Sequence, residues 1–257
     1  MAAYDSLTYS PVVSTALERV HYFPRQLITA DDMLAEQGYL REKLRRHNRY
    51  LHGWGVVCGC EVVPAQNGRP WEVQVCPGYA ITPQGDEILI REAIKFDLAG
   101  DWRQPYDPCA RPMPCGSTGV AGAEANPQKV FLAVCYAECN SRPVRVQLAG
   151  CACDEAACEY SRIRESFELV RLEALPKSHT QAFEADTNWH NAIITWKNTG
   201  NDTPPPLPSC PNICDDNCVV LASITQLKDR QTQIVPGQLT YVGRRVLYSV
   251  TAWYGMM

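Results

Sequence analysis

The sequence predicts a mainly β protein, with short antiparallel strands, one long amphipathic helix near the N-terminus and otherwise minor α+β content. Nineteen prolines and sixteen glycines among 257 residues indicate many turns between short elements. From residue 56 onward, apolar residues alternate with a period of two in closely spaced segments. This spacing leaves no room for the helices that connect parallel strands, so we expect antiparallel pairing. Only residues 29–53 show the apolar spacing of a long helix.

The predicted helix, "TADDMLAEQGYLREKLRRHNRYLHG", carries signals at both ends. Thr29 is the expected N-cap, with Asp32 at the capping-box position, and Gly53 is expected to end the helix. Arginines and lysines in its C-terminal half are expected to form a basic outer stripe. Gly38 in the interior costs about 1 kcal/mol relative to alanine, so a close contact with another backbone is expected there. Apolar residues on the opposite face and the tryptophan that follows form the predicted interaction set: Met33, Leu40, Leu44, His47, Leu51 and Trp54.

Composition divides the chain into four regions. We expect an N-terminal docking segment and helix at 1–53, a small β domain at 54–100, an irregular loop at 101–128, and a cysteine-rich β region at 129–257. In the last region, a Pro-rich linker at 201–211 is expected to be stiff and extended. At the first boundary, "HGWGVVCGC", Trp54 is expected to fill the joint between the helix and the first strand.

Charge and hydropathy exclude several classes of partner. The net charge of −4, with 20% charged residues, gives no reason to expect nucleic acid. No apolar run approaches the 18 residues that span a membrane, and "MAAYDSLTYSPVV" lacks the basic region of a signal peptide. We therefore expect assembly in the cytoplasm without direct membrane insertion. Release from the cell, or attachment to the envelope as part of a particle, stays open.

Thirteen cysteines suggest metal, disulfide or buried-thiol roles. One cluster of four would close a tetrahedral zinc site with no open position, and disulfides and buried thiols are the alternatives: Cys139, Cys151, Cys153 and Cys158. Strand alternation places Cys58 and Cys60 on one face, where buried packing is the simpler interpretation. The run "CPNICDDNC" is incomplete as a metal site.

No pattern in the chain predicts catalysis. The five histidines stand in no motif with a nucleophile, and neither a phosphate-binding glycine loop nor H-E-x-x-H is present. We therefore expect no enzymatic activity and no cofactor other than a structural zinc.

Two stretches carry a family resemblance. The run "YFPRQLITADDMLAEQGYLREKLRRHNRYLHGWGVVCGCEVV", followed by "VQVCPGYAITPQGDEI", resembles uncharacterised proteins encoded alongside contractile, phage-tail-like injection systems. The second stretch also looks like phage baseplate and tail-fibre proteins. The resemblance implies a structural, non-enzymatic subunit, peripheral at a baseplate or fibre, whose partners are other subunits in a ring or around an axis.

An alternative interpretation is a free β module that binds carbohydrate or another envelope ligand. It would use Trp71, Tyr79 and Trp102 as exposed stacking platforms.

Overall fold

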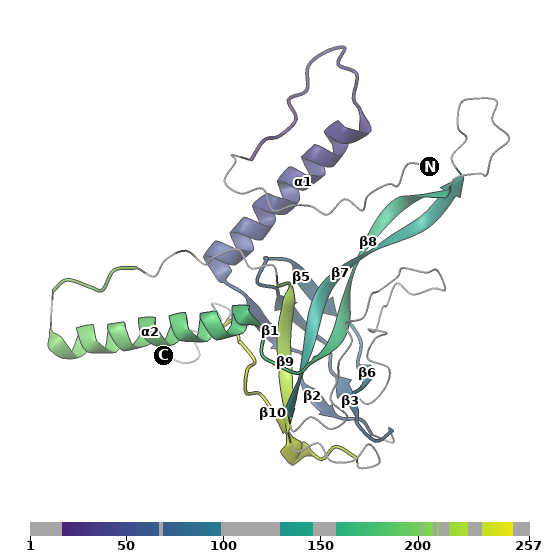
Figure 1. Ribbon diagram of the computed structural model, residues 1–257. Coiled ribbons are helices and arrows are strands. Elements are labelled where there is room, and N and C mark those ends of the chain that lie inside the picture. The colour runs from purple at the N-terminus through teal and green to yellow at the C-terminus, as the bar shows by residue number, and fades with distance from the viewer. Residues whose placement is uncertain are drawn as a thin grey trace.

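Antiparallel strands and two long helices make up the fold, which confirms the predicted class (Figure 1). The computed structural model describes residues 17–66, 69–98, 129–145, 158–200, 202–207, 210, 216–225 and 233–248. The strands form two sheets of three and one sheet of four. The predicted loop at 101–128 and the Asn67-Gly68 turn signal lie outside the described residues.

The two three-stranded sheets are consecutive halves of one bent meander. Their orders are β1-β4-β5 and β2-β3-β6, so each long strand of the meander contributes one segment to each sheet. The segments are β1 (Gly55–Gly59), β2 (Val62–Pro64), β3 (Glu72–Val75), β4 (Gly78–Ile81), β5 (Glu87–Ile90) and β6 (Ile94–Asp97). The antiparallel pairing predicted for these strands is confirmed.

The bend lies where "VVCGCEVV" was expected to continue as one strand. Gly59 and Cys60 both have positive φ, at 58° and 52°, and a Cβ on Gly78 would lie 2.2 Å from the Cys60 nitrogen. The ladder resumes when the Cys76 N–H donates to the carbonyl of Glu61 at 2.8 Å. As a result, Cys58 is exposed and Cys60 is 1% exposed, so the prediction that they share a face is wrong.

The four-stranded sheet has the order β10-β9-β7-β8. β7 (Lys129–Arg145) pairs with β8 (Cys158–Leu172) along its length, whereas β9 (Cys218–Thr225) pairs with β7 only from Lys129 to Cys135. β10 (Leu239–Thr240) is the other edge, and the short 3-10 helix η2 (Pro236–Gln238) precedes it. The outer parts of β7 and β8 therefore project from the body as a two-stranded ribbon (Figure 1).

A disulfide joins β7 to β9. Cys135 and Cys218 stand directly opposite each other in the register, 83 residues apart in sequence. The sequence grouped Cys218 with the nearby Cys210 and Cys214, and the structure instead gives it a partner from a distant strand. Such a bond stabilises a fold mainly by restricting the unfolded chain.

One hydrophobic core connects the meander to the four-stranded sheet. It contains Trp71, Val73 and Ile88 from the meander and Leu132 and Leu221 from the larger sheet, each no more than 1% exposed. The regions expected at 54–100 and 129–257 thus share their core. No helix in the described part of the chain is long and apolar enough to cross a membrane.

Two helices extend from this body (Figure 1). The predicted helix is α1 (Ala30–His47), followed by the π-helical turn η1 (Asn48–His52), which ends at Gly53 as expected. The second, α2 (Lys177–Thr199), is a long helix outside the one stretch whose apolar spacing predicted such a helix. Pro176 precedes it without a side-chain capping bond, so the usual start signal is missing from the sequence.

Candidate interaction surface on the N-terminal helix

The start of α1 is fixed by a reciprocal cap. The Asp32 N–H donates to the Thr29 hydroxyl at 3.2 Å, and the Thr29 N–H donates to the Asp32 carboxylate at 2.8 Å. These bonds confirm the predicted capping box. The Thr29 backbone holds the pKa of the Asp32 carboxyl below its usual value.

The basic side of α1 faces the body, which corrects the prediction of a basic outer stripe. Arg45 forms a two-pronged ion pair with Asp86, with nitrogen–oxygen distances of 2.7 and 2.8 Å. The Asn48 amide donates to the Gly85 carbonyl at 2.9 Å, and Arg49 donates to the carbonyl of Gln84 at 3.3 Å. One turn earlier in the helix, Arg41 pairs with Glu138 of β7, and these polar contacts together anchor the helix: Arg41, Arg45, Asn48 and Arg49.

The turn that receives the helix is itself rigidly built. The Thr82 N–H donates to the Asp86 carbonyl at 2.9 Å, and the Asp86 N–H donates to the Thr82 hydroxyl at 3.1 Å. Gly85 adopts φ +95°, and a Cβ there would lie 2.4 Å from the Arg45 carbonyl oxygen, so only glycine allows the helix this close. The two stretches that carry the family resemblance therefore meet at this turn.

The ion pair at the turn is shielded from water. Asp86 is 6% exposed, and the side chain of Arg45 is 15% exposed. Burial acts to lower the pKa of Arg45, but the hydrogen bonds and charge of Asp86 outweigh it and raise the pKa above its ordinary value. Two parallel N–H···O bonds to a shielded carboxylate fix both position and direction of the helix.

The apolar residues of the predicted interaction set on the helix are exposed, and so is Leu34, which lies on the same side as Arg41 and Arg45. Met33 is 49% exposed, Leu40 59%, Leu44 51% and Leu51 71%, and no residue of α1 is buried. His47 is also exposed, and its Nε2 lies 3.2 Å from Nε2 of His52. We call these five residues the outer stripe: Met33, Leu40, Leu44, His47 and Leu51.

Trp54, the sixth residue of the predicted interaction set, does not belong to this surface. Trp54 is 6% exposed, and the centre of its ring lies 4.6 Å from the centre of the His179 ring. The Arg245 guanidinium lies over the Trp54 ring, 4.8 Å from the ring centre. Its place in the joint after the helix agrees with the sequence, but burial removes it from any contact with a partner.

His179 forms a buried polar cluster that the sequence did not predict. Its Nε2 accepts the Val220 N–H at 3.0 Å, so the ring proton is on Nδ1 and donates to the Ser178 hydroxyl, also at 3.0 Å. That hydroxyl donates to Asp216 at 2.5 Å. Burial lowers the pKa of His179 to about 4, so the ring is neutral. Because the serine proton goes to Asp216 and not to the histidine, the cluster is structural and not a nucleophile–base pair.

Two of the four cysteines predicted to bind zinc are described, and they lie far apart. Cys139 pairs with Arg164 and Cys158 with Arg145, six positions further along β7. Six strand residues span about 20 Å, so the backbone places these two positions far apart along the ribbon. Cys151 and Cys153 lie outside the described residues, and a metal or disulfide there stays a prediction. Among the residues that the structure does describe, no group of three or more His, Cys, Asp or Glu side chains is placed to hold a metal.

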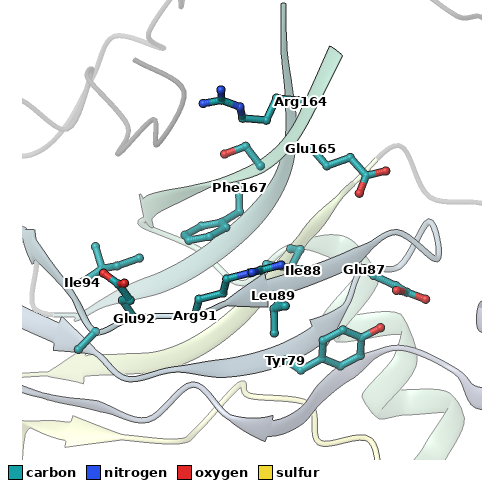
Figure 2. Close-up of a pocket in the computed structure, with 12 residues that line it drawn as sticks. Tyr79, Glu87, Ile88, Leu89, Arg91, Glu92, Ile94, Arg164, Glu165 and Phe167 are labelled. Carbon is teal, nitrogen blue, oxygen red and sulfur yellow. The ribbon is translucent and has the colours of Figure 1, made fainter. Parts of the chain in front are cut away.

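An open pocket of about 580 Å³ lies between β5, β6 and β8 (Figure 2). Figure 2 shows Phe167 between Arg164 and the pair formed by Arg91 and Glu92. Tyr79 lies at one side, where burial and a hydrogen bond with Glu87 raise its pKa. Five charged side chains of both signs line the pocket: Glu87, Arg91, Glu92, Arg164 and Glu165.

Two of the aromatic platforms of the ligand-binding alternative, Trp71 and Tyr79, do not share a groove. Trp71 is 1% exposed and packs in the core, whereas Tyr79 lines the pocket. Trp102 lies outside the described residues.

Comparison with protein-family models finds no match, and no curated protein matches this chain.

Proposed function

We propose that this protein is a structural, non-enzymatic subunit of a contractile, phage-tail-like assembly, placed at its periphery in a baseplate or fibre. The observation that supports this most is the outer stripe of α1, which is exposed on a helix whose neighbouring side is anchored to the body by ion pairs and hydrogen bonds. The resemblance of this helix and of the turn that holds it supplies the kind of assembly.

The anchoring suits a docking helix. Most helices in proteins gain their stability by burying an apolar face, and α1 buries none of its residues. Its polar anchors leave the apolar side chains outside, where they expose large hydrophobic groups to water. Contiguous exposed apolar surface of this kind commonly marks a protein–protein contact.

The same anchoring lowers the cost of binding. Arg45 and Asn48 hold α1 in one direction before any partner arrives, because both contact a turn that is already fixed by its own hydrogen bonds. A preformed helix loses less conformational entropy on docking than a segment that must fold. A rigid arm with an apolar face is what a subunit needs to join a repeating assembly.

The disulfide adds support for a protein that functions outside the cytoplasm. Disulfides such as Cys135–Cys218 persist in oxidising surroundings and are rare in reducing ones. A particle that is assembled in the cell and then released would meet such surroundings.

The pocket supports the ligand-binding alternative, but less strongly than the exposed stripe of α1 supports a structural role. Its volume is within the range of small-molecule sites. Such sites are mainly apolar, however, and this one is lined by five charged residues, while Trp71 is buried away from it. We therefore keep the ligand-binding module as the second candidate.

Affinity purification of the tagged protein from its native host tests the proposal. Negative-stain electron microscopy and mass spectrometry should find sheathed particles with tube and sheath proteins in the eluate. A lone soluble protein without such partners would overturn the proposal and direct attention to the pocket.

A matched pair of variants connects this test to the surface. Leu40→Glu with Leu44→Glu places charges on the outer stripe, whereas Leu207→Glu changes a residue that is 86% exposed elsewhere. Particles should be lost with the first variant and retained with the second. Equal recovery of particles from both would show that α1 is not the contact.

A further inference from the structure

The outer stripe follows the repeat of a coiled coil. Met33, Leu40 and His47 recur every seven residues, and Gln37 and Leu44 fall between them at steps of four and three. With the first three as d positions, the other two are a positions. All five are exposed, and they cover most of the 18 residues of α1. Leu51 continues the pattern into the π-helical turn.

We propose that α1 pairs with α1 of a second copy of this chain, parallel and in register, as a short coiled coil. The inference rests on the proposed function in that it names the partner of the same surface. The polar residues of the repeat favour a second copy as partner and select its direction.

Two polar layers favour the same helix as partner. Gln37 and His47 interrupt the apolar repeat, so a fully apolar partner would bury their polar atoms without hydrogen bonds. In an in-register pair, each of these layers meets its own copy, and amide faces amide. Single polar residues at such positions are known to fix register in coiled coils.

The flanking charges favour a parallel pair. Glu36 is at a g position and Arg41 at the following e position, and in a parallel pair g of one helix faces e of the other. By symmetry, the pair gains two such contacts. Arg41 keeps 43% of its side chain exposed beside Glu138, so its guanidinium has donors left for a second carboxylate.

The antiparallel arrangement fails on the same residues. In an antiparallel pair, Gln37 of one helix can still face His47 of the other. That alignment, however, places Lys43 beside Lys43 of the second copy and Arg41 beside Arg41 of the second copy. Like charges at these flanking positions destabilise a pair. The charge pattern therefore selects one direction.

The body leaves the stripe open to a second helix. Of the four anchors, Arg45 and Arg49 lie a third of a turn or more around the helix from the stripe at 100° per residue, whereas Arg41 and Asn48 are e positions at its edge. Figure 1 shows α1 rising from the body with its N-terminal half clear of every sheet.

Sedimentation of the full chain tests the pairing. The wild type should form a dimer whose population rises with concentration, as should the Leu207→Glu control. Leu40→Glu with Leu44→Glu should raise the dissociation constant at least about 100-fold, because the pair loses four buried leucines. Both leucines are at least half exposed, so circular dichroism should find the fold intact. A wild type that stays monomeric at every concentration would overturn the proposal, and so would a dimer unaffected by the double variant.

Direction is tested by crosslinking. In a parallel pair, Met33→Cys should form a disulfide between the two copies of residue 33, identified by mass spectrometry of the peptides. A link that forms only between Met33→Cys and Leu51→Cys would overturn the parallel arrangement. Glu36→Lys removes the acceptor of the Tyr22 hydroxyl within each chain but no buried contact, and it should weaken the dimer about tenfold at low salt and less at high salt.

The outcomes separate this inference from the proposed function. A monomer whose stripe variant loses the sheathed particles overturns self-pairing and leaves a different subunit as the partner. A monomer whose stripe variant loses thermal stability also overturns it and assigns the stripe to a contact within the same chain. A dimer that the stripe variant disrupts, from a protein that recovers no particles, supports self-pairing and overturns the proposed function.

Discussion

The two helices that project from the body are held in opposite ways. α1 has no buried residue and is attached by ion pairs and hydrogen bonds along its C-terminal half. α2 buries Ser178 and His179 in its first turn and stands clear of the body over most of its length (Figure 1). Polar anchoring leaves the apolar face of α1 available to a partner. In α2, by contrast, the buried side chains of the first turn pack into the body and fix the helix to it.

Each helix also carries an arginine–aspartate pair, and their surroundings differ. The Arg45–Asp86 pair of α1 has side chains 15% and 5% exposed. The Arg245–Asp186 pair of α2 has side chains 21% and 55% exposed. Exposed ion pairs contribute little to stability. Comparing these two arginine–aspartate pairs therefore shows how much shielding from water adds to the stabilisation by an ion pair.

The root of α2 should show the largest response, and it should respond to pH. Burial lowers the pKa of His179 from 6.5 to about 4, so the folded protein binds fewer protons here than the unfolded chain. The stabilisation is complete above pH 6.5 and is lost as the pH falls from 6.5 towards 4. It amounts to about 3 kcal/mol of unfolding free energy.

Urea unfolding at several pH values measures this effect. The wild type should lose stability more steeply than His179→Gln between pH 6.5 and 4, since other titrating groups are common to both. His190→Gln, a change at an exposed histidine of the same helix, should follow the wild type. Parallel curves for all three proteins would contradict the prediction.

The anchor of α1 should respond next. Asp86→Asn keeps the shape of the side chain but leaves the shielded Arg45 without its charge partner, which should lower the free energy of opening α1 by about 2 kcal/mol. Hydrogen exchange of the α1 amides measures the opening, and the amides of β7 should be unchanged. Asp186→Asn on α2 is the matched control, with an expected effect below about 0.5 kcal/mol. Equal losses in the two variants would mean that shielding does not decide the strength of these pairs.

Local signals in the sequence predicted α1 and most of the strands, but not α2, which lacks a side-chain cap at its start. The cap at Thr29, the end at Gly53 and the buried strands all follow from short-range patterns that act within a few residues. The sequence also identified which residues of α1 share a face. It did not identify which face meets the body, because that depends on the turn at Gly85 and Asp86, forty residues further along the chain.

The remaining misses have the same origin. The Cys135–Cys218 bond joins strands 83 residues apart, and His179 owes its burial to Trp54 and Val220 on distant elements. Neither has a spacing that a local pattern could reveal. One signal was available at the anchor, because Arg45, Asn48 and Arg49 stand one helical turn apart beside a "QGDE" turn rich in acceptors. Polar residues at that spacing indicate a polar contact as readily as a solvated face.

Gly38 gives the smallest effect and completes the contrast between the helices. Within the part of the chain that the structure describes, the close backbone contact expected there is absent, since a Cβ built on Gly38 meets nothing within 4 Å. Gly38→Ala should therefore stabilise α1 by about 0.5–1 kcal/mol, by restricting the unfolded chain and improving helix propensity. Hydrogen exchange of the α1 amides should slow about threefold or more, while α2 is unchanged. Because position 38 lies outside the a and d positions of the repeat, the substitution should leave the dissociation constant of the dimer no weaker. A destabilised helix would instead reveal that a neighbouring chain approaches Gly38 closely, which would place a second contact on α1 beside the outer stripe.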